Sequence, residues 1–166
     1  MYRKPVLYKL GQPVVSAPQA VPTGSITGIC EEWQDPTVKL LIVDDSPEIR
    51  AALRNIAGQL QHVVVGEAEN GKEALRLVPQ TRPDMVLLDI SMPVMGGFAT
   101  ARELRQIAPE LPIVFISQYA DEDCVTEAFG VGARGYLLKS AIYSELSLAI
   151  ESVANQKEYR SAQLVG

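Results

Sequence analysis

The sequence has few cysteines and a single histidine, and this excludes several kinds of metal or disulfide protein. Cys30 and Cys124 are its two cysteines, and neither has a CxxC partner. We therefore expect neither a disulfide framework nor a zinc site. His62 is the one histidine and precedes a predicted strand, which favours a surface position over a phosphorelay role.

Long hydrophobic runs and positive charge are also scarce. No apolar run approaches the roughly 20 residues that cross a bilayer, and prolines stand where a secretory signal would need an apolar segment. We therefore expect a soluble, cytoplasmic protein with no membrane contact. Asp and Glu number 20 against 15 Lys and Arg, a net charge of -5. Because nucleic-acid affinity depends on clustered basic residues, we expect no direct nucleic-acid binding by this segment.

Composition divides the chain of 166 residues into three parts. Residues 1–37 hold five of the eleven prolines and show no sustained hydrophobic period, which predicts a flexible Pro-rich extension. Residues 38–156 carry the patterns of one globular domain, and residues 157–166 are expected to be a C-terminal tail or linker stub.

Short apolar runs rich in β-branched residues alternate with amphipathic segments in the predicted domain, which is typical of repeated βα units. The runs LLIV, MVLL and IVFI are apolar at every position, so we expect a parallel sheet covered by helices on both faces. The predicted strands are Lys39–Val43, Val63–Ala68, Met85–Leu88, Ile113–Ile116 and Gly135–Leu138. The predicted helices are Pro47–Gln59, Gly71–Val78, Gly97–Ala108, Glu122–Gly130 and Ile142–Asn155.

Polar side chains follow four of the predicted strands. Because the carboxyl ends of parallel strands meet at one edge of a sheet, we expect these side chains to converge. They are Asp44 and Asp45, Asp89, Ser117 and Lys139. Converging carboxylates repel one another unless a cation neutralises them, and a site with oxygen ligands alone indicates Mg²⁺. A neighbouring lysine suits a phosphoryl group, so the pattern predicts a phosphorylated carboxylate.

Four segments, LLIVDDSPEIR, VLLDISMPVMGG, IVFISQYAD and ARGYLLKS, resemble the motif blocks of response-regulator receiver domains. The segment GARGYLLK is most similar to receivers of the LuxR-type helix-turn-helix subfamily. The resemblance implies a flavodoxin-like (βα)5 α/β fold, with a doubly wound five-stranded parallel sheet in strand order 2-1-3-4-5. A helix-turn-helix output domain needs about 60 residues, so we expect that domain to be absent from this chain.

The resemblance also implies a role for each residue at the sheet edge. Asp89 would be the phosphoacceptor that attacks a phosphohistidine on a sensor histidine kinase, and Lys139 would pair with the phosphoryl oxygens. Ser117 and Tyr136 would be switch residues that move on phosphorylation and change a partner-binding face. The implied Mg²⁺ ligands are Asp44, Asp45, Asp89 and the backbone carbonyl of Ser91.

The implied protein is a signalling phosphoacceptor rather than an enzyme with a separate substrate, and it catalyses its own Mg²⁺-dependent phosphorylation and dephosphorylation. Its implied partners are the sensor kinase and a downstream effector or output domain. The chain would then be the regulatory part of a transcriptional regulator. A homodimer through the first and fifth helices, or through the switch face, is a further partner to be tested.

Other interpretations stay open at this point. A haloacid-dehalogenase-like phosphatase also uses a strand-end Asp, Mg²⁺ and Lys, but it needs a second acid where Ser91 stands. A receiver that has lost phosphorylation could act as a constitutive interaction module. Each aspartate could alone be a helix or turn cap, Ser117 an ordinary loop hydroxyl and Tyr136 an ordinary strand aromatic.

Overall fold

The structure, a computed structural model, describes residues 37–164. The predicted Pro-rich extension, apart from its last residue, and Cys30 lie outside the described residues.

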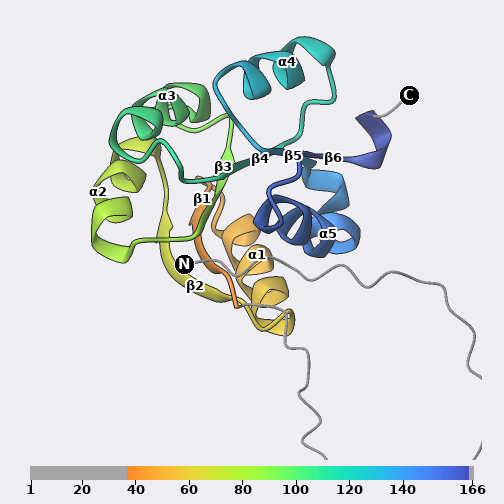
Figure 1. Ribbon diagram of the computed structural model, residues 1–166, viewed down its shortest axis with the longest axis horizontal. Helices are drawn as coiled ribbons and strands as arrows, with labels where there is room; N and C mark the ends of the chain where they lie inside the picture. The colour runs from red at the N-terminus through yellow and green to blue at the C-terminus, as the bar shows by residue number, and fades with distance from the viewer. Residues whose placement is uncertain (1–36, 165–166) are drawn as a thin grey trace, which may run out of the picture. The chain divides into compact units, whose positions relative to one another are not determined.

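A parallel sheet in the order β2-β1-β3-β4-β5-β6 forms the centre of the described domain (Figure 1). The flavodoxin-like fold and the order 2-1-3-4-5 are thereby confirmed. The strands are β1 (Lys39–Val43), β2 (Val63–Ala68), β3 (Met85–Asp89), β4 (Ile113–Ser117), β5 (Gly135–Leu138) and β6 (Tyr159–Arg160). Strands β3, β4 and β5 are buried at every position, as their apolar runs predict, and the burial extends to the polar residues that end β3 and β4.

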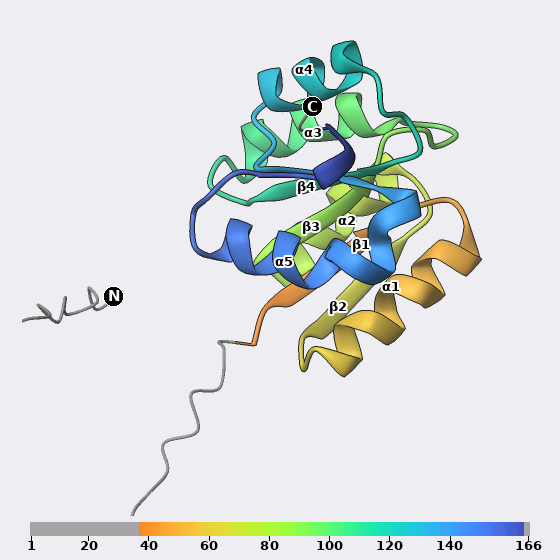
Figure 2. The same ribbon diagram turned by 90° about the vertical axis from the view of Figure 1, so that its right-hand side faces the viewer.

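Helices cover both faces of this sheet. One face carries α1 and α5, which contact each other, and the other carries α2, α3 and α4 (Figures 1 and 2). The helices are α1 (Pro47–Gln59), α2 (Gly71–Thr81), α3 (Gly97–Ile107), α4 (Glu122–Gly130) and α5 (Ile142–Ala154), with short 3₁₀ turns η1 (Lys139–Ala141) and η2 (Ala162–Leu164). Two buried layers between sheet and helices therefore hold the strand ends in fixed positions.

Side-chain caps fix where three helices begin. The side chains of Ser46, Asn70 and Asp121 accept hydrogen bonds from the backbone N–H groups of Ile49, Glu73 and Cys124. Such caps satisfy N–H groups that have no partner inside the helix. The predicted starts of α1, α2 and α4 agree with these caps.

Helix α2 runs past the predicted end at Val78, although Pro79 follows. Pro79 cannot donate a backbone hydrogen bond, so the sequence predicts that the helix stops before it. The helix continues to Thr81, whose hydroxyl donates to the Leu77 carbonyl at 3.0 Å. Arg82 caps this end: it has a left-handed φ of +46° and donates its N–H to the Val78 carbonyl.

The prediction of five strands was short by one. Strand β6 lies in the segment predicted to be a tail, and it pairs in parallel with β5. Its short sequence YR has no alternating hydrophobic pattern, and tertiary contacts described below hold it in place.

Within residues 37–164, the helices are all too short or too polar to cross a bilayer.

Candidate functional site

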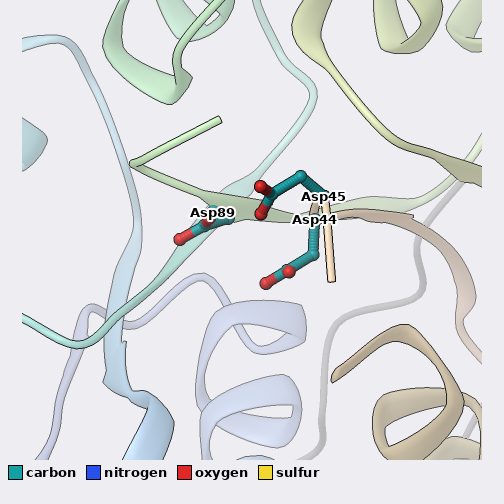
Figure 3. Close-up of side chains that lie close together, drawn as sticks. All are labelled: Asp44, Asp45 and Asp89. Carbon is teal, nitrogen blue, oxygen red and sulfur yellow. The ribbon is translucent and has the colours of Figure 1, made fainter. Parts of the chain in front are cut away.

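Three carboxylates meet at the carboxyl edge of the sheet (Figure 3). Asp44 and Asp45 directly follow β1, and Asp89 is the last residue of the neighbouring strand β3. One oxygen from each lies within 4.8 Å of one oxygen from each of the others. Asp44 is 1% and Asp89 3% exposed, whereas Asp45 is exposed to solvent. We call these residues the acidic notch.

Lys139 enters the acidic notch from the end of β5. Its ammonium Nζ lies 2.8 Å from Asp44 Oδ2 and 3.3 Å from Asp89 Oδ1. The lysine side chain is 21% exposed, so the two ion pairs are shielded from most of the solvent. The structure thus brings Lys139 to the edge at which the strand pattern predicts it.

Burial and charge oppose each other in the protonation of these groups. Burial raises the pKa of Asp89; Lys139 lowers it, and the nearby Asp44 raises it further, so the net shift is upward. Burial works against the charge of Lys139, but the close contacts of its ammonium with the carboxylates of Asp44 and Asp89 outweigh it and raise the pKa of the lysine. The notch therefore contains more negative charge than one lysine neutralises.

We expect Asp89→Asn to increase the free energy of unfolding at pH 7 without Mg²⁺, by on the order of 1 kcal/mol. Because the folded-state pKa of Asp89 is raised, the wild type loses stability as pH rises from about 4, the unfolded value, through the folded value. The gain from the substitution should thus be largest at neutral pH and shrink toward pH 4. Urea unfolding of both proteins across this range measures it, and a difference that does not change with pH would contradict it.

The acidic notch fits a magnesium ion. Asp44 Oδ2 is buried and makes no hydrogen bond of normal geometry, although the Lys139 ammonium lies 2.8 Å away as an ion pair. We regard this oxygen as neutralised in charge but free to accept another ligand. The carboxylate cluster has no sulfur or imidazole, which selects a hard cation. Ser91 follows β3 closely, and its backbone hydrogen bond lowers the pKa of Asp89, so it lies beside the notch.

Arg50 holds the turn that carries two of the three carboxylates. Its guanidinium donates to the main-chain carbonyl of Asp44 at 2.8 Å and to that of Asp45 at 3.2 Å. Glu67 and Glu69 hold the guanidinium in turn, at 3.5 and 3.3 Å. The sequence interpretation missed this residue, although its place five and six residues after the two acids, on the first turn of α1, was a usable signal.

The loop between β3 and α3 contains a strained residue. Val94 has a φ of +67°, and the Met95 N–H donates across it to the Pro93 carbonyl at 2.7 Å, which is the pattern of a γ-turn. Valine is branched at Cβ, so it adopts positive φ at a cost of about 1 to 3 kcal/mol. The side chain is 72% exposed and makes little packing contact that would offset this strain.

Val94→Asn should therefore increase the free energy of unfolding by about 1 kcal/mol, because asparagine tolerates this φ. Val63→Asn is the matched control, since Val63 is 49% exposed and lies in the extended strand β2. Urea denaturation of the two variants compares them. Equal effects of both substitutions would show that the backbone at Val94 is not strained.

The two predicted switch residues meet at Tyr119. Ser117, the buried last residue of β4, accepts a hydrogen bond from the Tyr119 N–H at 3.0 Å. Tyr136 is 0% exposed, and its hydroxyl donates to the Tyr119 carbonyl at 2.8 Å. The Tyr119 side chain reaches back to Ser91, and this hydrogen bond lowers the pKa of Tyr119. The ring of Tyr136 therefore points into the protein, and one loop joins it to the acidic notch.

Residues 40–151 match the family described as the response regulator receiver domain. The transcriptional regulatory protein YhcZ of Bacillus subtilis, described as uncharacterized, is 40% identical over 110 residues, which are 66% of this chain and 51% of that protein. The chain spans about half the length of the curated relatives it matches.

Solved structures agree with this match. A LuxR-family two-component response regulator from Aurantimonas sp. SI85-9A1 superposes with a TM-score of 0.75 and 31% identity, over 78% of this chain and 94% of that one. The chain also resembles the CheX–CheY–BeF₃⁻–Mg²⁺ complex of Borrelia burgdorferi, with a TM-score of 0.68 and 25% identity over 70% of this chain and 88% of that one.

Proposed function

The chain belongs to the response regulator receiver domain family, and from this premise we propose that Asp89 accepts a phosphoryl group from a sensor histidine kinase. The observation that carries this proposal is the acidic notch with Lys139 at 2.8 and 3.3 Å from two of its carboxylates. Phosphoryl transfer asks a protein mainly for positioning and charge neutralisation, and these residues supply both.

Each residue has a distinct part in the proposed reaction. An Asp89 carboxylate oxygen attacks the phosphorus of phosphohistidine, the phosphorus–nitrogen bond breaks, and the imidazole leaves with a proton taken from solvent. Lys139 is placed to bind the transferred oxygens, since its ammonium already lies 3.3 Å from Asp89 Oδ1. The product is an acyl phosphate, which water can hydrolyse to restore the carboxylate.

Mg²⁺ is the proposed cofactor, with Asp44, Asp45, Asp89 and the backbone carbonyl of Ser91 as its protein ligands. When bound, the ion would neutralise charge that develops on the phosphoryl oxygens. The solved CheX–CheY complex named above contains beryllofluoride and Mg²⁺, which supports this assignment. Asp44 also pairs with Lys139, so we assign the most direct metal contact to the exposed Asp45.

Phosphorylation is proposed to act on partners through Ser117 and Tyr136. The hydroxyl of Ser117 would turn to a phosphoryl oxygen and pull the loop that carries Tyr119, to which Tyr136 is already bonded. The changed face would bind a downstream effector or output domain. YhcZ is described as a transcriptional regulatory protein, so we propose that this receiver regulates transcription in the cytoplasm.

Intact-mass spectrometry after incubation with acetyl phosphate and Mg²⁺ tests the proposed function. The wild type should gain the mass of one phosphoryl group, and Asp89→Asn should gain none. Asp84→Asn is a matched control, because Asp84 is an exposed carboxylate bonded to the Lys39 N–H and lies outside the acidic notch. An unlabelled wild type would favour a constitutive interaction module, and turnover of small phosphate esters would favour a phosphatase.

A further inference from the structure

Strand β6 covers the outer edge of β5, the strand that carries Tyr136 (Figure 1). The Tyr159 N–H donates to the Arg134 carbonyl and the Ser161 N–H donates to the Tyr136 carbonyl, both at 2.9 Å. The Leu138 N–H donates to the Ser161 hydroxyl at 3.0 Å, and Ser161 is 0% exposed. Backbone bonds on both sides of the switch tyrosine thus depend on this segment.

The same segment is anchored to both helices beside β5. On the α5 side, the Glu145 carboxylate accepts from the Tyr159 hydroxyl at 2.7 Å and from the Ala162 N–H at 3.4 Å. Burial opposes the charge of Glu145, but hydrogen bonds from Ser161, Tyr159 and Ala162 outweigh it and lower the pKa of Glu145. On the α4 side, the guanidinium of Arg160 lies 4.3 Å from the centre of the Phe129 ring.

Tyr136 is opposite Arg160 in the pairing of β5 with β6. Paired residues of neighbouring strands project to the same face of a sheet, so Arg160 lies beside the switch ring, on the α4 face. A Tyr136 ring that left the interior toward this edge would have to displace Arg160 from Phe129. Strand β6 can therefore dock on β5 while the Tyr136 ring is buried. If the ring turned outward, it would compete with the docked β6 for the same space.

We infer that residues 159–162 form a clamp whose docking on β5 is coupled to phosphorylation through the inward position of Tyr136. This inference rests on the proposed function of Asp89. In the proposed switch, the Ser117 hydroxyl turns to a phosphoryl oxygen and draws the Tyr119 loop, which binds the Tyr136 hydroxyl, toward Asp89, so phosphorylation holds the ring inward and tightens the clamp. Coupling between two sites is reciprocal, so a docked clamp in turn favours the phosphorylated state. A partner that binds beside the clamp would therefore respond to whether Asp89 is phosphorylated.

Amide hydrogen exchange measured by NMR on the full chain tests the first half of this coupling. Beryllofluoride with Mg²⁺, an analogue of the phosphoryl group, should slow exchange of the Ser161 and Leu138 amides by roughly fivefold or more. Unchanged exchange of these amides, with beryllofluoride bound, would overturn the coupling.

Substitutions at Ser161 test the reciprocal half. Ser161→Pro removes the N–H that donates to the Tyr136 carbonyl, and the milder Ser161→Ala removes only the hydroxyl, which binds the Leu138 N–H and Glu145. Both should weaken beryllofluoride binding, by roughly fivefold for proline and less for alanine. Gln163→Ala is the control, because Gln163 is exposed and outside the clamp.

The outcomes separate the coupling from the proposed function. If the wild type labels on Asp89 but the Ser161 variants bind beryllofluoride as tightly as it does, the clamp alone is wrong. If the wild type takes neither a phosphoryl group nor beryllofluoride, both the clamp and the proposed function are wrong.

Discussion

Lys139→Met is expected to slow phosphorylation of Asp89 by acetyl phosphate about a hundredfold, the usual effect of removing one charged or hydrogen-bonding group that stabilises a transition state. The lysine is the one side chain that forms ion pairs with both Asp44 and Asp89 among the described residues. Without Lys139, no side-chain cation of the notch would bind the incoming phosphoryl oxygens, and the proposed Mg²⁺ alone would offset the repulsion from the carboxylates.

The rate of mass gain under saturating Mg²⁺ measures this effect. Lys72→Met serves as the control, since Lys72 is exposed on α2 and forms no ion pair with the acidic notch. The control should label at the wild-type rate. A Lys139→Met protein that labels as fast as this control would remove the lysine from the proposed reaction.

Gly97→Ala is expected to decrease the free energy of unfolding by roughly 2 to 3 kcal/mol. A methyl group on Gly97 would lie 2.9 Å from Ile90 Cα and 3.0 Å from the carbonyl carbon of Asp89, and still closer to the Asp89 carbonyl oxygen. These neighbours are backbone atoms, which cannot move aside as a flexible side chain can. The substitution should therefore shift Asp89, the proposed phosphoacceptor.

Gly58→Ala is the matched control for this loss. Gly58 lies on the exposed side of α1, and an added methyl group would meet nothing within 4 Å. Alanine favours the helix over glycine by about 0.5 to 1 kcal/mol, so this variant should gain stability. Urea denaturation compares the two, and a Gly97→Ala protein as stable as the wild type would contradict the described packing of α3 against β3.

The chemistry of the strand ends made most of the site predictable from sequence. Asp44 and Asp89 each come directly after an apolar run, LLIV in β1 and MVLL in β3, so their place at one edge follows from the parallel pairing of these strands. Lys139 is predictable for the same reason, and the structure puts it in contact with both acids. The starts of α1 and α4 were predictable because the side chains of Ser46 and Asp121 cap these helices.

The features that could not be predicted from the sequence depend on contacts between residues that are distant in the chain. Strand β6 is two residues long, and its stability comes from partners such as Glu145 and Phe129, which no local pattern reveals. Arg50 acts on the backbone of the acidic turn, and its spacing from Asp44 and Asp45 suggests proximity but does not show that it binds their main-chain carbonyls. The inward ring of Tyr136 likewise depends on the Tyr119 carbonyl from another strand's loop.

A crystal structure of the chain with beryllofluoride and Mg²⁺ tests the central claim most directly. We expect beryllium bonded to a carboxylate oxygen of Asp89, a fluorine in contact with the Lys139 ammonium, and Mg²⁺ bound by Asp45, Asp89 and the Ser91 carbonyl, with Asp44 bound directly or through water. Beryllofluoride and Mg²⁺ bound at any other place, or an acidic notch that takes up neither at saturating concentrations, would contradict it.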